Sequence, residues 1–298
     1  MTPSQPRSEN LTGILLMLAA MALFAVEDLF LKLAAVGLPV GQIVLVSGVL
    51  GGPVFWSMAR RQGQGIFVKD ALHPAVIARN LGEMVAAASY VAALAAVPLG
   101  TVAAVLQALP LAVTLGAALV FKERVGWRRW TAISVGFAGV LLVIRPGGDG
   151  FRLEAMLVLI SVAGIVVRDL AARAIPRSVT TAQVSAWGLM AVTVLGLGMI
   201  AASGDVRMVT GSEALVLLGA GIFGTAGYWA VTKATRTGEV AVVAPFRYSR
   251  LVFSMGLGVV FLAERPDLPT LAGSALIVCS GLYAFARERR AIRASHAG

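Results

Sequence analysis

The chain of 298 residues is poor in cysteine, histidine and charge. Cys279 is its only cysteine, so an intramolecular disulfide is impossible. The two histidines, His73 and His296, lie outside the strongest apolar runs and give little basis for a zinc site. Charged residues make up 13% of the chain, against about 25% in an average soluble domain. These shortages argue against a disulfide scaffold, a metal centre and a soluble enzyme, and we expect neither a metal nor a cofactor.

Apolar residues are abundant instead: 58% of the chain is hydrophobic and the mean hydropathy is +0.85. One globular core cannot bury so much apolar surface, whereas a bilayer-crossing helix needs about 20 such residues in a row. Runs of this kind cover residues 13–34, 39–59, 74–97, 100–121, 127–144, 153–172, 181–202, 211–234, 240–262 and 268–286. The sequence therefore predicts an all-α integral membrane protein with about ten transmembrane helices.

The net charge of +10 is distributed unevenly between alternate loops. Basic residues concentrate at the N-terminus, near residues 60–69, 122–129, 173–177 and 233–236, and after residue 286. The other side of the predicted membrane holds only Lys32, Arg145, Arg152, Arg207 and Arg265. This asymmetry follows the positive-inside rule and predicts that both termini are cytoplasmic. The basic excess is explained by membrane topology and by affinity for anionic lipid, so we expect the lipid bilayer as a partner and no nucleic acid.

Several polar residues recur at a constant separation of 141 positions. Asp28 and Lys32 recur as Asp169 and Arg173, Glu123 recurs as Glu264, and Gln42 recurs as Gln183. We therefore expect a duplication, with residues 1–146 and 150–290 as the two repeats of a single transport unit, joined at Arg145-Pro-Gly-Gly-Asp-Gly150. Because each repeat holds five spans, equivalent helices must cross the membrane in opposite directions. Inverted repeats of this kind are characteristic of secondary transporters, whose substrate site lies near the midplane.

Four segments carry a family resemblance: 121–130 (FKERVGWRRW), 136–146 (GFAGVLLVIRP), 244–248 (APFRY) and 273–281 (GSALIVCSG). They resemble the repeated unit of EamA-type exporters in the drug/metabolite transporter superfamily, and the chain is similar to the bacterial amino-acid exporter group that includes YddG. The resemblance implies a carrier in the bacterial inner membrane. Related proteins move amino acids, nucleotide-sugars, riboflavin, S-adenosylmethionine or cationic drugs.

Two sets of motifs have structural explanations. Gly219, Gly221 and Gly224 match G-x-G-x-x-G, but they lie inside an apolar run, where small residues let membrane helices approach closely. Asp28 and Lys32, and likewise Asp169 and Arg173, are spaced i,i+4 on one helix face, which favours local pairing. Glu123 and Glu264 stand at span ends, where we expect contacts within the repeat. We interpret these charges as structural.

A site for an asymmetric molecule should hold polar residues that break the repeat. Intramembrane charges are expensive and normally face a cavity or a partner. The candidate substrate-binding residues that meet this criterion are Arg79, Glu83, Gln107, Tyr228, Trp229, Arg247, Tyr248 and Arg250. Snorkelling is an equal alternative for Arg79, and ordinary packing is an alternative for Tyr228 and Trp229.

Arg247 and Arg250 lie three residues apart and so share one helix face. We expect Glu83 or Tyr248 to compensate one of these two cations, leaving the other for a substrate carboxylate. Arg250→Leu should then impair transport without impairing folding. Pro110 and Pro245 are possible hinges in the fourth and ninth spans.

These features predict a carrier that exports a small amphipathic metabolite, with a free amino acid as the first candidate. The arginines suit a carboxylate, Glu83 suits an ammonium group, and the aromatic side chains suit an apolar body. The alternatives are a transporter of riboflavin, S-adenosylmethionine or a cationic drug and, as other classes, a channel or a membrane enzyme. An enzyme is not expected, because the chain carries no H-E-x-x-H motif, no cysteine–histidine pair and no paired intramembrane aspartates. The chain has no P-loop either, which argues against pumping driven by ATP. The sequence carries no signature of an oligomeric state.

Overall fold

The computed structural model describes residues 7–65, 68–123, 125–148, 152–176 and 178–295, and this part of the chain is helical without any strand. The helices are α1 (Arg7–Gly37), α2 (Val40–Arg61), η1 (Lys69–Leu72), α3 (Pro74–Ala96), α4 (Leu99–Leu106), α5 (Leu109–Val120), α6 (Trp127–Ile144), η2 (Leu153–Ala155), α7 (Met156–Arg173), α8 (Thr181–Ser203), α9 (Gly211–Thr237), α10 (Val240–Val243), η3 (Ala244–Tyr248), α11 (Ser249–Leu262) and α12 (Leu268–Ser295). The predicted all-α membrane fold is confirmed, with the fourth and ninth spans each divided into shorter helices. Residues 124, 149, 150, 177 and 296, on which some expectations rest, lie outside the described residues.

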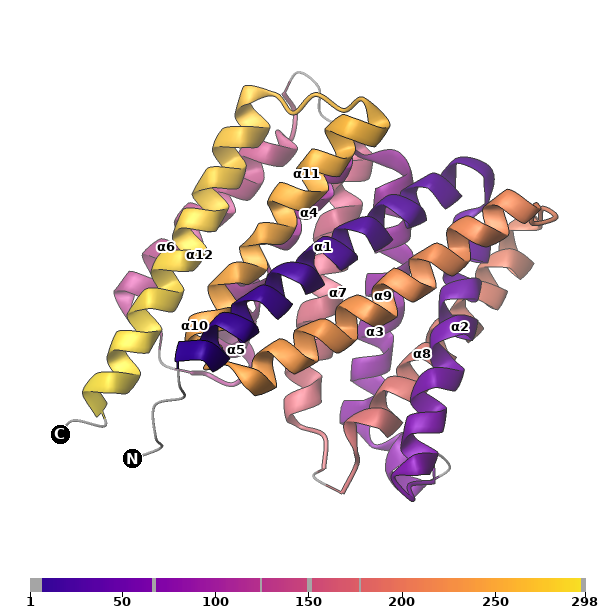
Figure 1. The fold of residues 1–298 in the computed structure, drawn as a ribbon, viewed down its shortest axis with the longest axis horizontal. Helices are drawn as coiled ribbons and strands as arrows, with labels where there is room; N and C mark the ends of the chain where they lie inside the picture. The colour runs from indigo at the N-terminus through magenta and orange to yellow at the C-terminus, as the bar shows by residue number, and fades with distance from the viewer. Residues whose placement is uncertain (1–6, 66–67, 124, 149–151, 177, 296–298) are drawn as a thin grey trace.

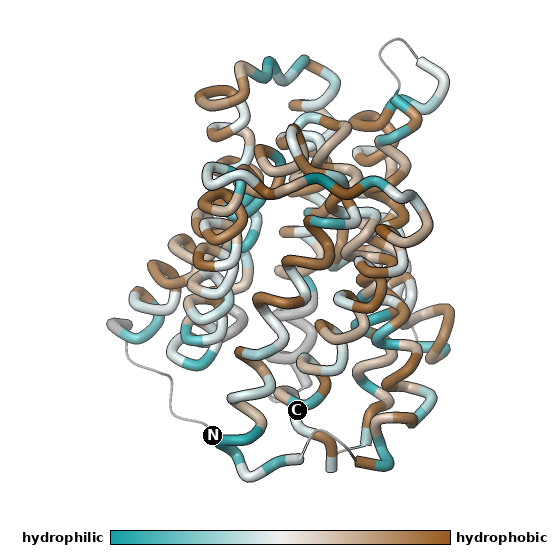
Figure 2. The backbone as a smooth tube through the Cα atoms, turned by 90° about the vertical axis from the view of Figure 1, so that its right-hand side faces the viewer, coloured by the Kyte–Doolittle hydropathy of each residue, from teal (hydrophilic) through white to brown (hydrophobic). Residues whose placement is uncertain are grey.

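The helices are long and apolar enough to cross a bilayer. Eight helical segments of the described chain meet that condition, and α3 and the α10–η3–α11 region bring the total to about ten. Figure 2 shows apolar segments along most helices and hydrophilic residues at both ends of the bundle. The chain is therefore a multi-pass membrane protein.

Polar residues set several helix ends. Thr180 with Gln183 begins α8 and Thr210 with Glu213 begins α9, each as a reciprocal capping box. His73 accepts a hydrogen bond from the Ala75 amide at the start of α3. One of the two histidines thus serves a helix end.

The main helix interfaces have the symmetry of a duplicated chain. The helix pairs with the most extensive contacts are α1 with α9, α2 with α8, α3 with α7, and α6 with α12. A shift of 141 residues exchanges the α1–α9 and α3–α7 pairs and maps each of the other two pairs onto itself. Figure 1 shows α1 beside α9, and α2 beside α8. A two-fold relation between the halves produces this pattern, and five spans per half make the repeat inverted.

Glycines bring the paired helices together at their backbones. A Cβ on Gly82 would lie 2.7 Å from the Gly164 carbonyl oxygen, and one on Gly139 would lie 2.7 Å from that of Gly273. Gly219 lies against the Phe30 ring, so the G-x-G-x-x-G segment serves helix packing. Larger residues at these positions would force paired helices apart.

The fourth and ninth spans are interrupted at equivalent positions. α4 ends before Gln107, and η3 ends at Tyr248, 141 residues later. The Gln107 side-chain amide donates to the Arg247 carbonyl at 3.3 Å and to the Tyr248 carbonyl at 3.2 Å. This amide ties the break in the fourth span to the break in the ninth, so the two breaks meet each other near the pseudo-two-fold axis.

The prolines do not mark these breaks symmetrically. Pro110 follows its break, in the first turn of α5, and Pro245 precedes its break, in the first turn of η3. A first helical turn accepts proline at little cost because its amide needs no helical partner. Whether either proline acts as a hinge stays a prediction.

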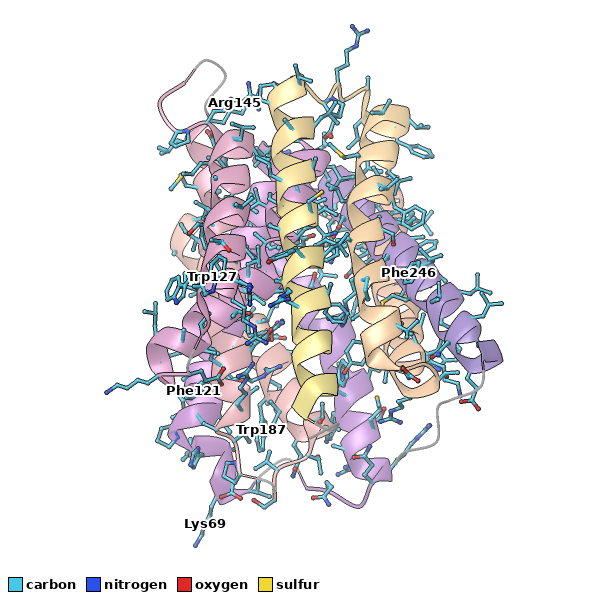
Figure 3. The ribbon with its side chains drawn as sticks, turned by 90° about the vertical axis from the view of Figure 1, so that its left-hand side faces the viewer. Lys69, Phe121, Trp127, Arg145, Trp187 and Phe246 are labelled. Carbon is cyan, nitrogen blue, oxygen red and sulfur yellow. The ribbon has the colours of Figure 1, made fainter. Side chains whose placement is uncertain are left out.

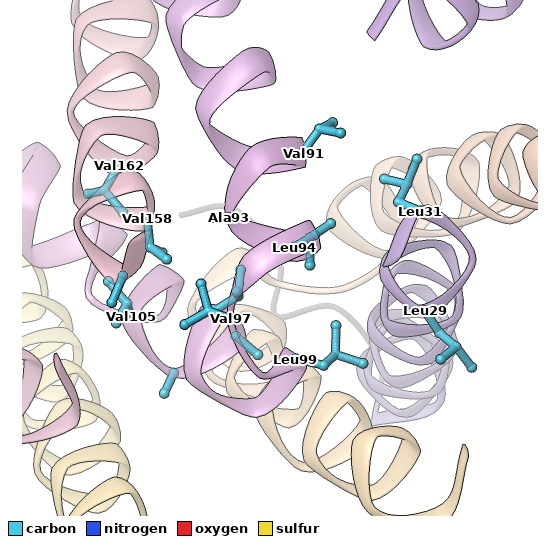
Figure 4. Packing of buried hydrophobic residues seen from close by; sticks show 14 of the residues in the cluster. Leu29, Leu31, Val91, Ala93, Leu94, Val97, Leu99, Val105, Val158 and Val162 are labelled. Atoms are coloured by element: carbon cyan, nitrogen blue, oxygen red, sulfur yellow. The ribbon is translucent and has the colours of Figure 1, made fainter. Parts of the chain in front are cut away.

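The largest apolar cluster joins both halves. Side chains of α1, α3, α4 and α7 meet in it, among them Leu29, Leu94, Val105 and Val158 (Figure 4). We call the end of the bundle where α1 begins and α12 ends the terminal face, and the opposite end the far face (Figure 1). In Figure 3, Lys69 stands at the terminal face and Arg145 at the far face.

Candidate functional site

A cavity of about 1390 Å³ runs between α1, α2, α3, α7, α8 and α9. Toward the far face its walls are apolar, as at Leu31 and Leu217. Gln62, Lys233 and Arg236 line it near the terminal face, where α2 and α9 end. The cavity therefore has an apolar inner end and a basic outer end.

Four of the eight predicted substrate-binding residues line this cavity: Arg79, Glu83, Tyr228 and Trp229. The Tyr228 ring meets Phe55 edge to face, with 5.5 Å between the ring centroids. The four others, Gln107, Arg247, Tyr248 and Arg250, are not among its lining residues. The structure thus separates the predicted set into a cavity group and a group at the helix breaks.

Glu83 is enclosed by two arginines. Arg79 Nη2 lies 3.2 Å from Glu83 Oε2, and Arg168 Nη1 lies 3.5 Å from Glu83 Oε1. Arg168 also donates from Nε to Asp169 Oδ1 at 2.9 Å. Two guanidinium groups and two carboxylates therefore form a neutral cluster. Glu83 is not the free carboxylate that the sequence led us to expect.

Arg250 belongs to a buried cluster around Asp28. Its Nη2 lies 2.8 Å from each Asp28 carboxylate oxygen, and its Nε lies 3.2 Å from Oδ2. The Tyr90 hydroxyl donates to Asp28 Oδ1 at 2.5 Å. Asp28 is only 2% exposed, and the Phe24 ring lies under the guanidinium. Neither Glu83 nor Tyr248 compensates Arg250, in contrast to the sequence-based expectation.

Arg247 and Tyr248 point elsewhere. Arg247 is exposed, so it does not share the environment of Arg250 despite the spacing of three residues. The Tyr248 hydroxyl lies against Gly281 of α12. These residues and Gln107 surround the helix breaks rather than the cavity.

The expected i,i+4 ion pairs are replaced by bridges between the halves. Lys32 lies 3.8 Å from Glu264 and donates to the Leu94 and Val97 carbonyls at 2.9 and 2.5 Å, while Arg173 lies 3.2 Å from Glu123. These two bridges are equivalent under the 141-residue shift. Lys32 and Glu264 are 16% and 13% exposed, whereas Arg173 and Glu123 are 49% and 52% exposed. The far-face bridge is thus largely shielded from solvent, and the terminal-face bridge is about half exposed.

Glu27 and Arg168 are cavity-lining charges that sequence analysis missed. Glu27 neighbours Asp28 in the chain but points about 100° away around α1, toward Gly224 of α9. The sequence held a signal for both residues, because Glu27 and Arg168 are equivalent under the 141-residue shift and carry opposite charges. Tyr90 carried no comparable signal, since one tyrosine in an apolar span is ordinary.

A smaller cavity of about 210 Å³ lies at the far face between the ends of α3, α6, α11 and α12. Arg145 pairs there with Asp267, which also accepts a hydrogen bond from the Thr270 amide at 3.0 Å. Hydrogen bonds from Thr270 and from Arg145 lower the pKa of Asp267 from 3.8 to about 2. Asp267 precedes α12, so it caps this helix and ties it to the end of α6.

In the part of the chain that the structure describes, no group of three histidine, cysteine or acidic side chains could hold a metal ion. The charged clusters instead pair acids with arginine, tyrosine or lysine. The large cavity can therefore recognise a molecule through its charged and aromatic side chains.

Comparison with known proteins gives two matches of one family model. The EamA-like transporter family model matches residues 11–145 and 152–285. A solved crystal structure has the same fold, with a TM-score of 0.60, 23% identity and coverage of 96% of this chain and 99% of the other.

Three similar proteins have names that specify a cargo. A riboflavin transporter of Rhizobium johnstonii is 30% identical over 221 residues, which is 71% of each chain. The pseudopaline exporter CntI of Pseudomonas aeruginosa strain UCBPP-PA14 is 26% identical over 273 residues, covering 90% of this chain and 93% of the exporter. An S-adenosylmethionine uptake transporter of Rickettsia felis is 24% identical over 199 residues, which is 67% of each chain.

Proposed function

The chain belongs to the EamA-like transporter family of the drug/metabolite transporter superfamily, and from this premise we propose that it is a secondary transporter that exports amino acids. The observation that carries the proposal is the composition of the large cavity, in which both signs of charge stand beside aromatic side chains. Arginine suits a carboxylate, a carboxylate suits an ammonium group, and aromatic faces suit an apolar side chain. A free amino acid has all three parts.

We propose that Arg79, Glu83, Tyr228 and Trp229 contact the substrate. Gln107, Arg247, Tyr248 and Arg250 are left out of this contact set, because the cavity lining does not include them. Transport then proceeds by alternating access, in which the two repeats, residues 1–146 and 150–290, exchange conformations around the cavity. The two-fold pattern of helix interfaces supports this mechanism.

The proposed location is the bacterial inner membrane, with both termini cytoplasmic. The terminal face then faces the cytoplasm, and the basic outer end of the cavity opens toward the cell interior. A small molecule and the lipid bilayer are the proposed partners, without nucleic acid. Loading from the cytoplasm suits an exporter.

A second candidate cargo is a larger metabolite such as riboflavin. The cavity volume of about 1390 Å³ exceeds the range of about 300–1,000 Å³ typical of small-molecule sites. The riboflavin transporter of Rhizobium johnstonii is also a relative at 30% identity. Size and kinship therefore support this alternative to an amino acid.

Substrate counterflow in proteoliposomes tests the proposal. Vesicles preloaded with an unlabelled compound should accumulate the same labelled compound only if the carrier exchanges it. Exchange of an amino acid supports the first proposal, whereas exchange of riboflavin without any amino acid would replace it with the second. Vesicles with an Arg79→Leu variant serve as the site control and should lose exchange.

A further inference from the structure

Glu27 is a cavity-lining carboxylate that makes no hydrogen bond or ion pair with any residue in the described part of the chain. It differs in this respect from the carboxylates around it. Glu83 and Asp169 are neutralised by Arg79 and Arg168, and Asp28 is paired with Arg250. An ionised carboxylate away from water is costly unless a cation compensates it.

The surroundings of Glu27 combine this charge with aromatic surface. Phe24 lines the cavity from the preceding turn of α1. On the neighbouring helix α9, Gly224 lies directly against Glu27 Oε1, because only hydrogen occupies the space where a side chain would begin. Tyr228 lies one turn further along the same face of α9. Anionic and aromatic groups together attract organic ammonium ions.

We propose that Glu27 binds the ammonium group of an amphipathic aromatic amine or zwitterion carried by this cavity. The inference rests on the proposed transport function and specifies the substrate class. The cavity arginines Arg79 and Arg168 are already paired with Glu83 and Asp169, so the carboxylate of a zwitterion contributes less to binding here than its ammonium group. Nine residues separate Gly224 from Lys233, about 13 Å along a helix, so a short molecule held at Glu27 does not reach the basic outer end.

Three indole compounds that differ in charge test the proposal on the purified full-length protein. Tryptamine is cationic, tryptophan is zwitterionic and indole-3-propionate is anionic at pH 7. Binding is measured by thermal stabilisation over a concentration series. Both amines should bind about tenfold or more tightly than the anion, as expected when one charge-assisted contact is gained. Equal or tighter binding of the anion, or no stabilisation by either amine, overturns the proposal.

Glu27→Gln should abolish the preference for the amines while leaving the weak binding of the anion unchanged. Glu9→Gln is the matched control, because Glu9 lies on the same helix but does not line the cavity. A preference that persists in Glu27→Gln, or that disappears equally in Glu9→Gln, contradicts the assignment.

Gly224→Ala displaces the Glu27 carboxylate without removing its charge, because the new methyl group would overlap Glu27 Oε1. The flexible side chain can move, so the fold should persist while amine binding weakens about tenfold. Gly219→Ala makes a similarly close contact with Phe30 on the same two helices, away from the cavity lining, and should leave amine binding unchanged. Equal effects of the two substitutions would show that helix packing, not Glu27, is responsible.

The outcome is separable from the amino-acid proposal. Glu27-dependent binding of tryptamine without counterflow of any amino acid retains the ammonium site and removes amino-acid export. Amino-acid counterflow that Glu27→Gln leaves intact retains export and removes the ammonium site.

Discussion

Replacing Arg250 by leucine should destabilise the protein strongly, because it leaves Asp28 buried without a cation. Arg250 supplies three close nitrogen–oxygen contacts to a carboxylate that is 2% exposed, and the Tyr90 hydroxyl donates one hydrogen bond to it. Removing one partner of a buried ion pair typically costs about 3–5 kcal/mol. The sequence-based expectation that Arg250→Leu would leave folding intact is therefore reversed.

A second substitution distinguishes the lost charge from the lost packing. Asp28→Asn in the Arg250→Leu background removes the stranded charge and keeps an acceptor for Tyr90. It should therefore recover about 2 kcal/mol or more of the loss. Arg247→Leu is the matched control, because Arg247 is exposed three residues away and should change stability by less than about 0.5 kcal/mol.

The measurement is equilibrium unfolding of the purified proteins in mixed detergent micelles. A loss of 3 kcal/mol corresponds to a change of more than about 100-fold in the unfolding equilibrium constant. Wild-type stability of Arg250→Leu would refute the reasoning, and so would a double variant no more stable than Arg250→Leu.

Three further predictions concern the rest of the molecule. Reporter fusions after Arg129 and after Arg293 should both report the cytoplasm and a fusion near Asp205 the periplasm, and reversed signals would contradict the proposed orientation. The stability that Asp267 adds should be complete above about pH 4 and decline as pH falls toward 2, because its pKa is depressed from 3.8 to about 2 in the fold. The difference in stability between wild type and Asp267→Asn should therefore shrink over this interval, and a constant difference would contradict the ion pair. Gly82→Val should disrupt the α3–α7 contact and cost about 1–3 kcal/mol, since its added atoms would overlap the backbone of α7, whereas Gly256→Val, with open space around its Cβ position, should cost less in the same unfolding assay.

The helices and their duplication could be predicted because they depend on long, local patterns. Each span is a run of apolar residues, and the constant shift of 141 residues needs no knowledge of contacts. The interruption of two spans was harder to locate. Pro110 and Pro245 are the local signals of a bend, yet the breaks fall at Gln107 and Tyr248, where the Gln107 side-chain amide donates to the Arg247 and Tyr248 carbonyls. That contact joins residues 141 positions apart and leaves no local trace.

The partners of the charged residues could not be predicted from spacing. Asp28 and Lys32 have the i,i+4 separation of a helical ion pair, but Arg250 offers Asp28 a bidentate contact and Glu264 lies near Lys32. Local spacing permits a pair, and tertiary packing decides whether a better partner is present. Glu27 is a different case. The 141-residue shift places Arg168 at the equivalent position, so the change of charge can be read from the sequence, but only the structure shows that both residues line a cavity.

The unequal burial of the two equivalent bridges makes them respond differently to ionic strength. Salt screens exposed charges within a Debye length of about 8 Å at 0.15 M, and it acts much less on buried pairs. The exposed Arg173–Glu123 bridge is therefore sensitive to salt, whereas the Lys32–Glu264 bridge, supported by backbone carbonyls, is much less so. Under the alternating access proposed above, salt on the terminal side therefore acts on an exposed contact between the repeats, while the far-face contact changes only when its own protein contacts break.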